Sequence, residues 1–299
     1  MRALRAIIAV CIVLFMAVAS YSAEGVKLRY DLSIYQDAKA GQLRYPEGIA
    51  CDKSTIIVAD TANDRLVKYT IQEKEAKGGE EIRVAQLSQP IRLQINSKGD
   101  IFALDGKQRR IVNLDRSGQF KAVVAIEGAP PPAVVPRSFK IDRDNLLYVL
   151  DIAGNRVIVC SPDGKFQRQI EIPKESGFAS DLAVDLRGNI LVLDSVYEQL
   201  YSAPKGASAF SALKTSFKEY LLFPVAISVD NRVTIFVTDG NGGAIAVLAP
   251  DGTFLGKQLS EGRNEASLFF PSQTCINEEG KIFVADRGNN RVQVFTVVR

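Results

Sequence analysis

The sequence predicts an all-β protein: a six-bladed β-propeller of four-stranded antiparallel blades, closed by an N-terminal strand in the last blade. Three observations predict it: a sixfold internal repeat, alternating apolar and polar residues inside each copy, and one unmatched strand-like segment near the N-terminus. A repeat of about 45 residues indicates a solenoid or a propeller. The apolar spacing of two residues excludes helical solenoids, and four short strands per copy form a propeller blade.

Each copy of the repeat contains an apolar run, a polar turn, a second apolar run ending in aspartate, a loop and a third run. The first copy reads PEGIACD at 46–52 and IIVADT at 56–61, and the last reads PSQTCIN at 271–277 and IFVADR at 282–287. Such runs, with turn residues between them, are typical of antiparallel meanders. We expect the polar run 73–81 to be a long hairpin turn. The aspartates that end the second runs follow one another at steps of 45, 46, 43, 45 and 47 residues and are Asp60, Asp105, Asp151, Asp194, Asp239 and Asp286.

These residues resemble the NHL repeat, in which a Pro-x-Gly-Ile-Ala-Val-Asp strand precedes a strand ending in Ala-Asp and an Asn-Asn-Arg step. Residues 271–295 are similar through VADRGNNRVQVF, residues 46–69 through VADTANDRLVKY, and residues 136–160 through LDIAGNRVIV. The resemblance extends over nearly the whole of residues 24–299 and implies a secreted bacterial NHL-type propeller. Its motifs are specific for fold and not for activity.

The ring is expected to close by strand exchange between the two ends of the chain. The sixth copy stops after its third strand, at 292–298, and has no fourth. Near the N-terminus, apolar residues alternate with polar or charged ones, which predicts a strand. As the outer strand of blade six it would cover an otherwise exposed sheet edge. The alternating residues are Val26, Leu28, Tyr30, Leu32 and Ile34.

Residues 1–23 are interpreted as a Sec-type signal peptide, with a single propeller at 24–299. Arg2 and Arg5 flank the start, the stretch from Ile7 to Val18 is apolar, and small residues follow, which is the order of a signal peptide. Cleavage anywhere from residue 19 to 23 stays open, as does an uncleaved anchor, although a spanning helix needs about 20 apolar residues. We therefore expect a secreted or periplasmic protein with no membrane span after cleavage.

The net charge argues against binding to nucleic acid or anionic lipid, and the cysteine content argues against a disulfide framework. The chain has a formal charge of +3, and loss of the two N-terminal arginines leaves it nearly neutral, so nothing electrostatic favours binding to nucleic acid or anionic lipid. Three cysteines follow the predicted signal peptide: Cys51, Cys160 and Cys275. Because they are scattered and odd in number, we expect buried free thiols and no disulfide framework.

In four copies an arginine follows the repeated aspartate by five residues, and we expect an ion pair in each. Such a pair would fix the loop between the second and third strands and satisfy buried groups, so the hypothesis gives these residues a structural role. In the fourth and fifth copies Gln199 and Ala244 replace the arginine, and the glycine-rich loop 240–243 is expected to be the most mobile. The four expected pairs are Asp60–Arg65, Asp105–Arg110, Asp151–Arg156 and Asp286–Arg291.

A ligand site is expected at the channel mouth, where the chain enters the innermost strands. Polar side chains of mixed sign that converge on a concave mouth are typical of binding sites; the alternative is a water-filled channel with solvated charges. Two arginines beside one carboxylate favour a ligand with an anionic group. The candidate ligand-binding residues are Arg92, Arg137, Asp181, Glu47 and Gln273.

The sequence indicates a binding scaffold more readily than an enzyme. The chain has no histidine, which removes histidine bases, Ser-His-Asp triads and histidine-ligated metals. Streptogramin lyases and peptide-amidating lyases, which are similar in fold, rely on histidines. We expect a protein, peptide or small anionic ligand, no cofactor, and a monomer or a subunit of an envelope complex. Two alternatives stay open: a hydrolase or lyase of the gluconolactonase kind with Ca²⁺ held by oxygen ligands, and a structural subunit of the cell envelope.

Overall fold

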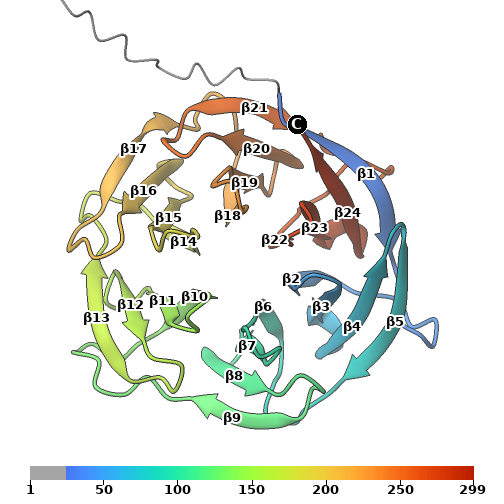
Figure 1. The fold of residues 1–299 in the computed structure, drawn as a ribbon, viewed down its shortest axis with the longest axis horizontal. Helices are drawn as coiled ribbons and strands as arrows, with labels where there is room; N and C mark the ends of the chain where they lie inside the picture. The colour runs from blue at the N-terminus through green and yellow to red at the C-terminus, as the bar shows by residue number, and fades with distance from the viewer. Residues whose placement is uncertain (1–24) are drawn as a thin grey trace, which may run out of the picture.

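The computed structural model describes residues 25–299, which form six four-stranded antiparallel sheets arranged in a ring (Figure 1). The six-bladed propeller predicted from the repeats is confirmed. The predicted signal peptide, residues 1–23, lies outside the described residues. Within residues 25–299 there is no helix of the length and apolar character needed to cross a bilayer.

The first three blades each use four consecutive strands, with the innermost strand first. Blade one contains β2 (Pro46–Cys51), β3 (Thr55–Asp60), the 3-10 turn η1 (Thr61–Asn63), β4 (Arg65–Gln72) and β5 (Glu75–Ile82). Blade two contains β6 (Pro90–Ile95), β7 (Ile101–Asp105), β8 (Arg110–Leu114) and β9 (Phe120–Val124). Blade three contains β10 (Pro136–Ile141), β11 (Leu147–Asp151), β12 (Arg156–Cys160) and β13 (Phe166–Glu171).

The last three blades follow the same order except at the end of the chain. Blade four contains β14 (Ala179–Val184), β15 (Ile190–Asp194), β16 (Gln199–Ala203) and β17 (Ser211–Ser216). Blade five contains β18 (Pro224–Val229), β19 (Ile235–Asp239), β20 (Ala244–Leu248) and β21 (Phe254–Gln258). Blade six contains β22 (Thr274–Ile276), β23 (Lys281–Asp286), the 3-10 turn η2 (Arg287–Asn289), β24 (Arg291–Val298) and, on its outside, β1 (Lys27–Ile34).

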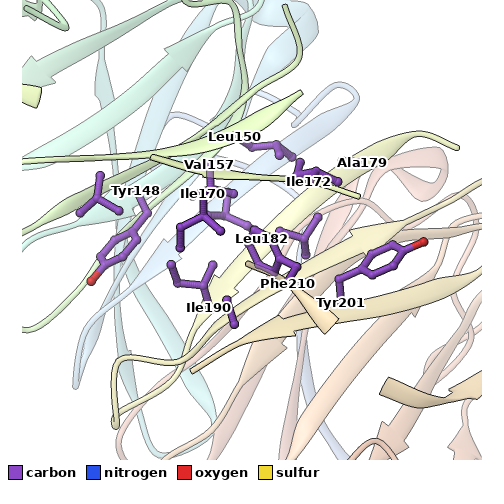
Figure 2. Close-up of a cluster of buried hydrophobic side chains, with 13 residues drawn as sticks. Tyr148, Leu150, Val157, Ile170, Ile172, Ala179, Leu182, Ile190, Tyr201 and Phe210 are labelled. Carbon is purple, nitrogen blue, oxygen red and sulfur yellow. The ribbon is translucent and has the colours of Figure 1, made fainter. Parts of the chain in front are cut away.

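The hydrophobic core consists of six clusters, one between each pair of neighbouring blades. Figure 2 shows the cluster between blades three and four, where Tyr148 and Leu150 of β11 pack with Leu182 and Ile190 of the next blade. Both faces of every sheet are therefore buried. This is why the second strand of each blade is apolar on both sides and does not alternate.

Strand β1 closes the ring by pairing antiparallel with β24, from Lys27 opposite Val298 to Ile34 opposite Val292 (Figure 1). The pairing predicted between the two ends of the chain is thus present. Its register shifts between Tyr30 and Leu32, which is the effect of one extra residue in a bulged strand.

The bulge decides which neighbours β1 packs against. Leu28 and Tyr30 lie against the cluster between blades five and six, whereas Leu32 and Ile34 lie against the cluster between blades six and one. Strict alternation would place all four side chains on one face of the sheet. The bulge instead lets a single strand cover apolar side chains on both sides of blade six.

A disulfide between Cys51 and Cys275 joins the innermost strands of blades one and six. The expectation that these two cysteines are free thiols is wrong, whereas Cys160 is free and buried. The two bonded residues are 224 positions apart in the chain, yet their Cα atoms are 6.0 Å apart, because ring closure places the first and last innermost strands side by side. The ring is closed twice, at its rim and near its centre.

Deleting residues 24–35 is expected to lower the melting temperature strongly, because the deletion bares the edge of β24 and uncovers two apolar clusters. Thermal unfolding under oxidising conditions, which keep the disulfide intact, measures the effect. Lys27→Ala is the control, since this side chain of β1 is exposed and its loss should leave the melting temperature unchanged. A truncated protein that melts like the parent would contradict closure by β1.

Candidate functional site

The aspartate that ends the second strand of each blade fixes the loop leading into that blade's innermost strand. Its carboxylate accepts a hydrogen bond from a backbone N–H 16 or 17 residues earlier, at 2.6–3.2 Å. All six carboxylates are buried, so they need such partners. The donor–acceptor pairs are Arg44–Asp60, Ser88–Asp105, Val135–Asp151, Phe178–Asp194, Phe223–Asp239 and Phe269–Asp286.

Three of the four expected ion pairs are formed. Each joins the arginine Nε to an aspartate Oδ2, and each guanidinium is buried. The remaining N–H groups reach the preceding loop, as Arg156 does in donating to the carbonyls of Pro130 and Pro132 at 2.8 and 2.9 Å. The pairs are Asp60–Arg65 at 2.6 Å, Asp151–Arg156 at 2.8 Å and Asp286–Arg291 at 2.7 Å.

The fourth expected pair, Asp105–Arg110, is not formed. Asp105 instead accepts hydrogen bonds from the backbone N–H groups of Lys107 and Gln108. Arg110 donates from Nη2 to the carbonyl of Gln86 at 2.8 Å, and its buried Nε has no hydrogen-bond partner among the described residues. Blade two therefore holds its loops without the arginine.

Backbone N–H groups also replace the arginine in blades four and five. Asp239 accepts four of them, from Leu222, Phe223, Asn241 and Gly242, at 2.8–3.2 Å. A Cβ atom at Gly242 would collide with the Asp239 carboxylate, so glycine at this position lets the loop backbone come close to its acceptor. Asp194 has an equivalent set of donors, which are Gly177, Phe178, Val196 and Tyr197.

Arg156→Ala is expected to destabilise the protein by about 1–3 kcal/mol, because it leaves the buried Asp151 carboxylate without its charged partner. Arg110→Ala is the matched control, since it breaks no ion pair and should cost less. Denaturant unfolding of both variants measures the difference. Equal losses in the two would contradict a special role for the Asp151–Arg156 pair.

Gln273, a candidate ligand residue, spans the channel from blade six to blades one and two. Its Oε1 accepts hydrogen bonds from the backbone N–H groups of Ile49 and Leu93, each at 3.1 Å, and its Nε2 donates to the Leu93 carbonyl at 3.1 Å. Innermost strands present an unpaired edge to the channel. Gln273 is buried and satisfies part of that edge with its carbonyl oxygen and one of its two amide N–H donors.

Asp181 plays a similar part on the other side of the channel. Its carboxylate accepts a hydrogen bond from the Ser138 hydroxyl of blade three and, at 3.0 Å, from the backbone N–H of Ile227 in blade five. The carboxylate is buried. Blades three, four and five are thereby linked at their inner edges.

Cationic side chains surround Asp181. Burial lowers the pKa of the Lys140 amine, and Arg92 lowers it further while Asp181 raises it. Burial and repulsion from Arg92 likewise lower the pKa of Arg137. Lys140 was not among the predicted site residues, although it lies two positions after Ser138 and thus on the same side of β10. The positive charge at the channel therefore comes from Lys140 as well as from the two arginines.

The candidate residues do not share one exposed arc. Arg92 is buried inside the channel. Arg137 is half-buried nearer the surface, with its guanidinium carbon 5.5 Å from the centre of the Phe178 ring. Glu47 lies on the same side of the ring, 3.6 Å from Arg287, in a partly exposed pair that contributes little to stability.

Exposed apolar side chains gather on one side of the propeller, which we call the loop face. It comprises the loops leading into the innermost strands and the loops between second and third strands, because antiparallel pairing brings both to the same end of each blade. These side chains are 37–69% exposed, and they follow no periodic pattern in the sequence. They are Tyr45, Ile152, Phe178, Val196, Tyr197, Leu222, Phe223 and Phe270.

The channel residues do not fit the Ca²⁺ ion that the gluconolactonase alternative implies. Asp181 is already hydrogen-bonded to Ser138 and Ile227. The cations Lys140 and Arg137, which both interact with it electrostatically, repel a divalent ion. Across residues 25–299, no three or more His, Cys, Asp or Glu side chains are grouped as a metal site requires.

The fold defines the class of the protein, a six-bladed β-propeller, and one segment of it is similar to the NHL repeat. Residues 270–295 match the family model described as NHL repeat. NHL repeat-containing protein 3 from Homo sapiens is 32% identical over 75 residues, which are 24% of this chain and 22% of that protein. The Mus musculus protein of the same name matches to the same extent. The matched segment thus spans less than a quarter of these relatives.

Several solved structures are similar to this chain over most of its length. They support the fold alone, because their sequence identities to it are low. A catalytically inactive histidine-to-alanine variant of virginiamycin B lyase from Staphylococcus aureus has a TM-score of 0.62 at 14% identity, covering 92% of this chain and 100% of that one. A Xanthomonas campestris gluconolactonase has a TM-score of 0.63 at 13% identity, covering 91% and 89%. A chain of a nidogen–laminin complex has a TM-score of 0.58 at 14% identity, covering 78% and 93%.

Proposed function

We propose that this propeller is a non-enzymatic binding module that recognises a protein partner through the loop face of blades four and five. One observation carries the proposal: exposed apolar side chains project from loops whose backbone N–H groups are bound by the buried carboxylates of Asp194 and Asp239. A fixed backbone that presents apolar side chains to solvent is preorganised for contact. The side chains are Phe178, Val196, Tyr197, Leu222 and Phe223.

Arg137 gives this surface a charge preference. Its guanidinium lies over the Phe178 ring, at the border between the apolar loops of blade four and the cationic channel. Asp181 and Glu47 act on this guanidinium electrostatically, but its Nε has no hydrogen-bond partner among the described residues, and such a guanidinium favours an anionic group on the ligand. The partner surface that fits is an apolar segment with an acidic side chain or a terminal carboxylate beside it.

The chemistry of the chain supports binding over catalysis. The similar lyase structure is described as inactive when one histidine is replaced by alanine, and this chain has no histidine. The gluconolactonase alternative needs a metal cation beside Asp181, where the cationic side chains of Lys140 and Arg137 already lie. The polar groups of Gln273 and Asp181 are used to join blades.

We also propose that the protein works outside the cytoplasm, as a secreted or periplasmic protein of the bacterial NHL type. The apolar N-terminal pattern supports export. The disulfide between Cys51 and Cys275 supports an oxidising compartment, because disulfides persist there and are rare in the cytosol.

The double variant Tyr197→Ser, Leu222→Ser is expected to lose its partners in a pull-down from the cell envelope while its melting temperature stays unchanged, since both side chains are at least half exposed. Leu186→Ser is the matched control: it is 44% exposed but lies in the turn between β14 and β15, on the opposite side of the ring. Arg137→Ala should weaken capture in a salt-dependent way. A double variant that folds normally and captures the same partners would refute the proposal.

A further inference from the structure

A cleft of about 310 Å³ opens on the loop face between blades two and three. Its walls come from β8, the end of β9 and the connection to β10, and include apolar side chains and two arginines. Of the described residues that line it, none is acidic. Its volume lies at the lower end of the range for small-molecule sites, about 300–1,000 Å³. The residues that matter here are Arg109, Arg110, Ile111, Val124, Ile126 and Val134.

Arg110 differs from the equivalent arginines of three other blades. In blade three, Arg156 Nε donates to Asp151 at 2.8 Å. In blade two, Asp105 is occupied by backbone N–H groups, and Arg110 Nε is buried without an acceptor. Buried polar groups nearly always have partners. Arg110, whose buried Nε has no acceptor among the described residues, therefore lines this cleft together with the more exposed Arg109.

We propose that this cleft binds a small apolar carboxylate. The carboxylate accepts hydrogen bonds from Arg110, whose forked N–H groups match its geometry, and Arg109 adds a second positive charge. The hydrocarbon body lies against Ile111, Val124 and Ile126, where it removes apolar surface from water. The ligand supplies Arg110 with a carboxylate partner, which Arg156 has in Asp151 and which Asp105 does not provide in blade two.

This inference goes beyond the proposed function, which concerns a protein partner on blades four and five. The two sites share no residues, so the failure of one leaves the other standing. The ligand class follows from the residues that line the cleft. The apolar side chains favour a hydrocarbon body, and Arg110, which has no carboxylate partner, favours a single anionic head.

Titration calorimetry with sodium 4-phenylbutyrate tests the proposal, with 4-phenylbutanamide as the neutral probe of the same shape. The acid is expected to bind, and the amide about tenfold more weakly or worse, because a charge-assisted hydrogen bond is lost. Arg110→Gln should reduce affinity for the acid by a similar factor. Arg143→Gln, an exposed arginine elsewhere, should change nothing.

Ala129→Leu provides a second arm that does not touch the arginine. Ala129 lines the cleft, and a larger side chain there should block binding of the acid while the melting temperature stays unchanged. Equal binding of acid and amide, or full affinity in a folded Arg110→Gln variant, would overturn the proposal. The absence of binding by the acid at about 10 mM would also overturn the proposal, because a preformed site of this size should have a dissociation constant below that concentration.

Discussion

The buried aspartate that ends the second strand of each blade is the interaction on which the rest of the structure depends. One carboxylate has two oxygens with four acceptor positions, so it can serve the loop before the innermost strand and the loop after the second strand at once. Asp239 does this with backbone donors alone, from Leu222 and Phe223 on one side and Asn241 and Gly242 on the other. The loop face is therefore built on six buried carboxylates.

Polar side chains in the channel connect the inner strands of different blades. Ring closure leaves the inner edges of the blades without neighbouring strands, and unpaired N–H groups there need acceptors. Gln273 and Asp181 supply them across the channel, while the disulfide joins Cys51 to Cys275. We therefore propose that recognition takes place on the loop face, where apolar side chains are exposed to solvent.

The fold could be predicted from the sequence because its signals are local. The step between aspartates and the alternation of apolar residues recur in six copies, and the one strand-like segment outside the copies lies near the N-terminus. What could not be predicted depends on contacts between distant segments. Cys51 meets Cys275 only after the ring closes. Arg110 has the spacing of Arg156 but not its partner. Residues 73–81, expected to be a turn, mostly belong to strand β5, which pairs with β4 through its backbone and carries little apolar pattern.

Amide hydrogen exchange in an Asp239→Ala variant tests the central claim most directly. Asp239 has no arginine partner, so its removal leaves no buried cation behind, and Asp144→Ala, an exposed aspartate, is the control. The account predicts faster exchange at Leu222 and Phe223 as well as at Asn241 and Gly242, because each loses its acceptor, with strand β19 still protected. Exchange that rises only at Asn241 and Gly242, or at neither loop, would contradict the claim that one carboxylate fixes both loops.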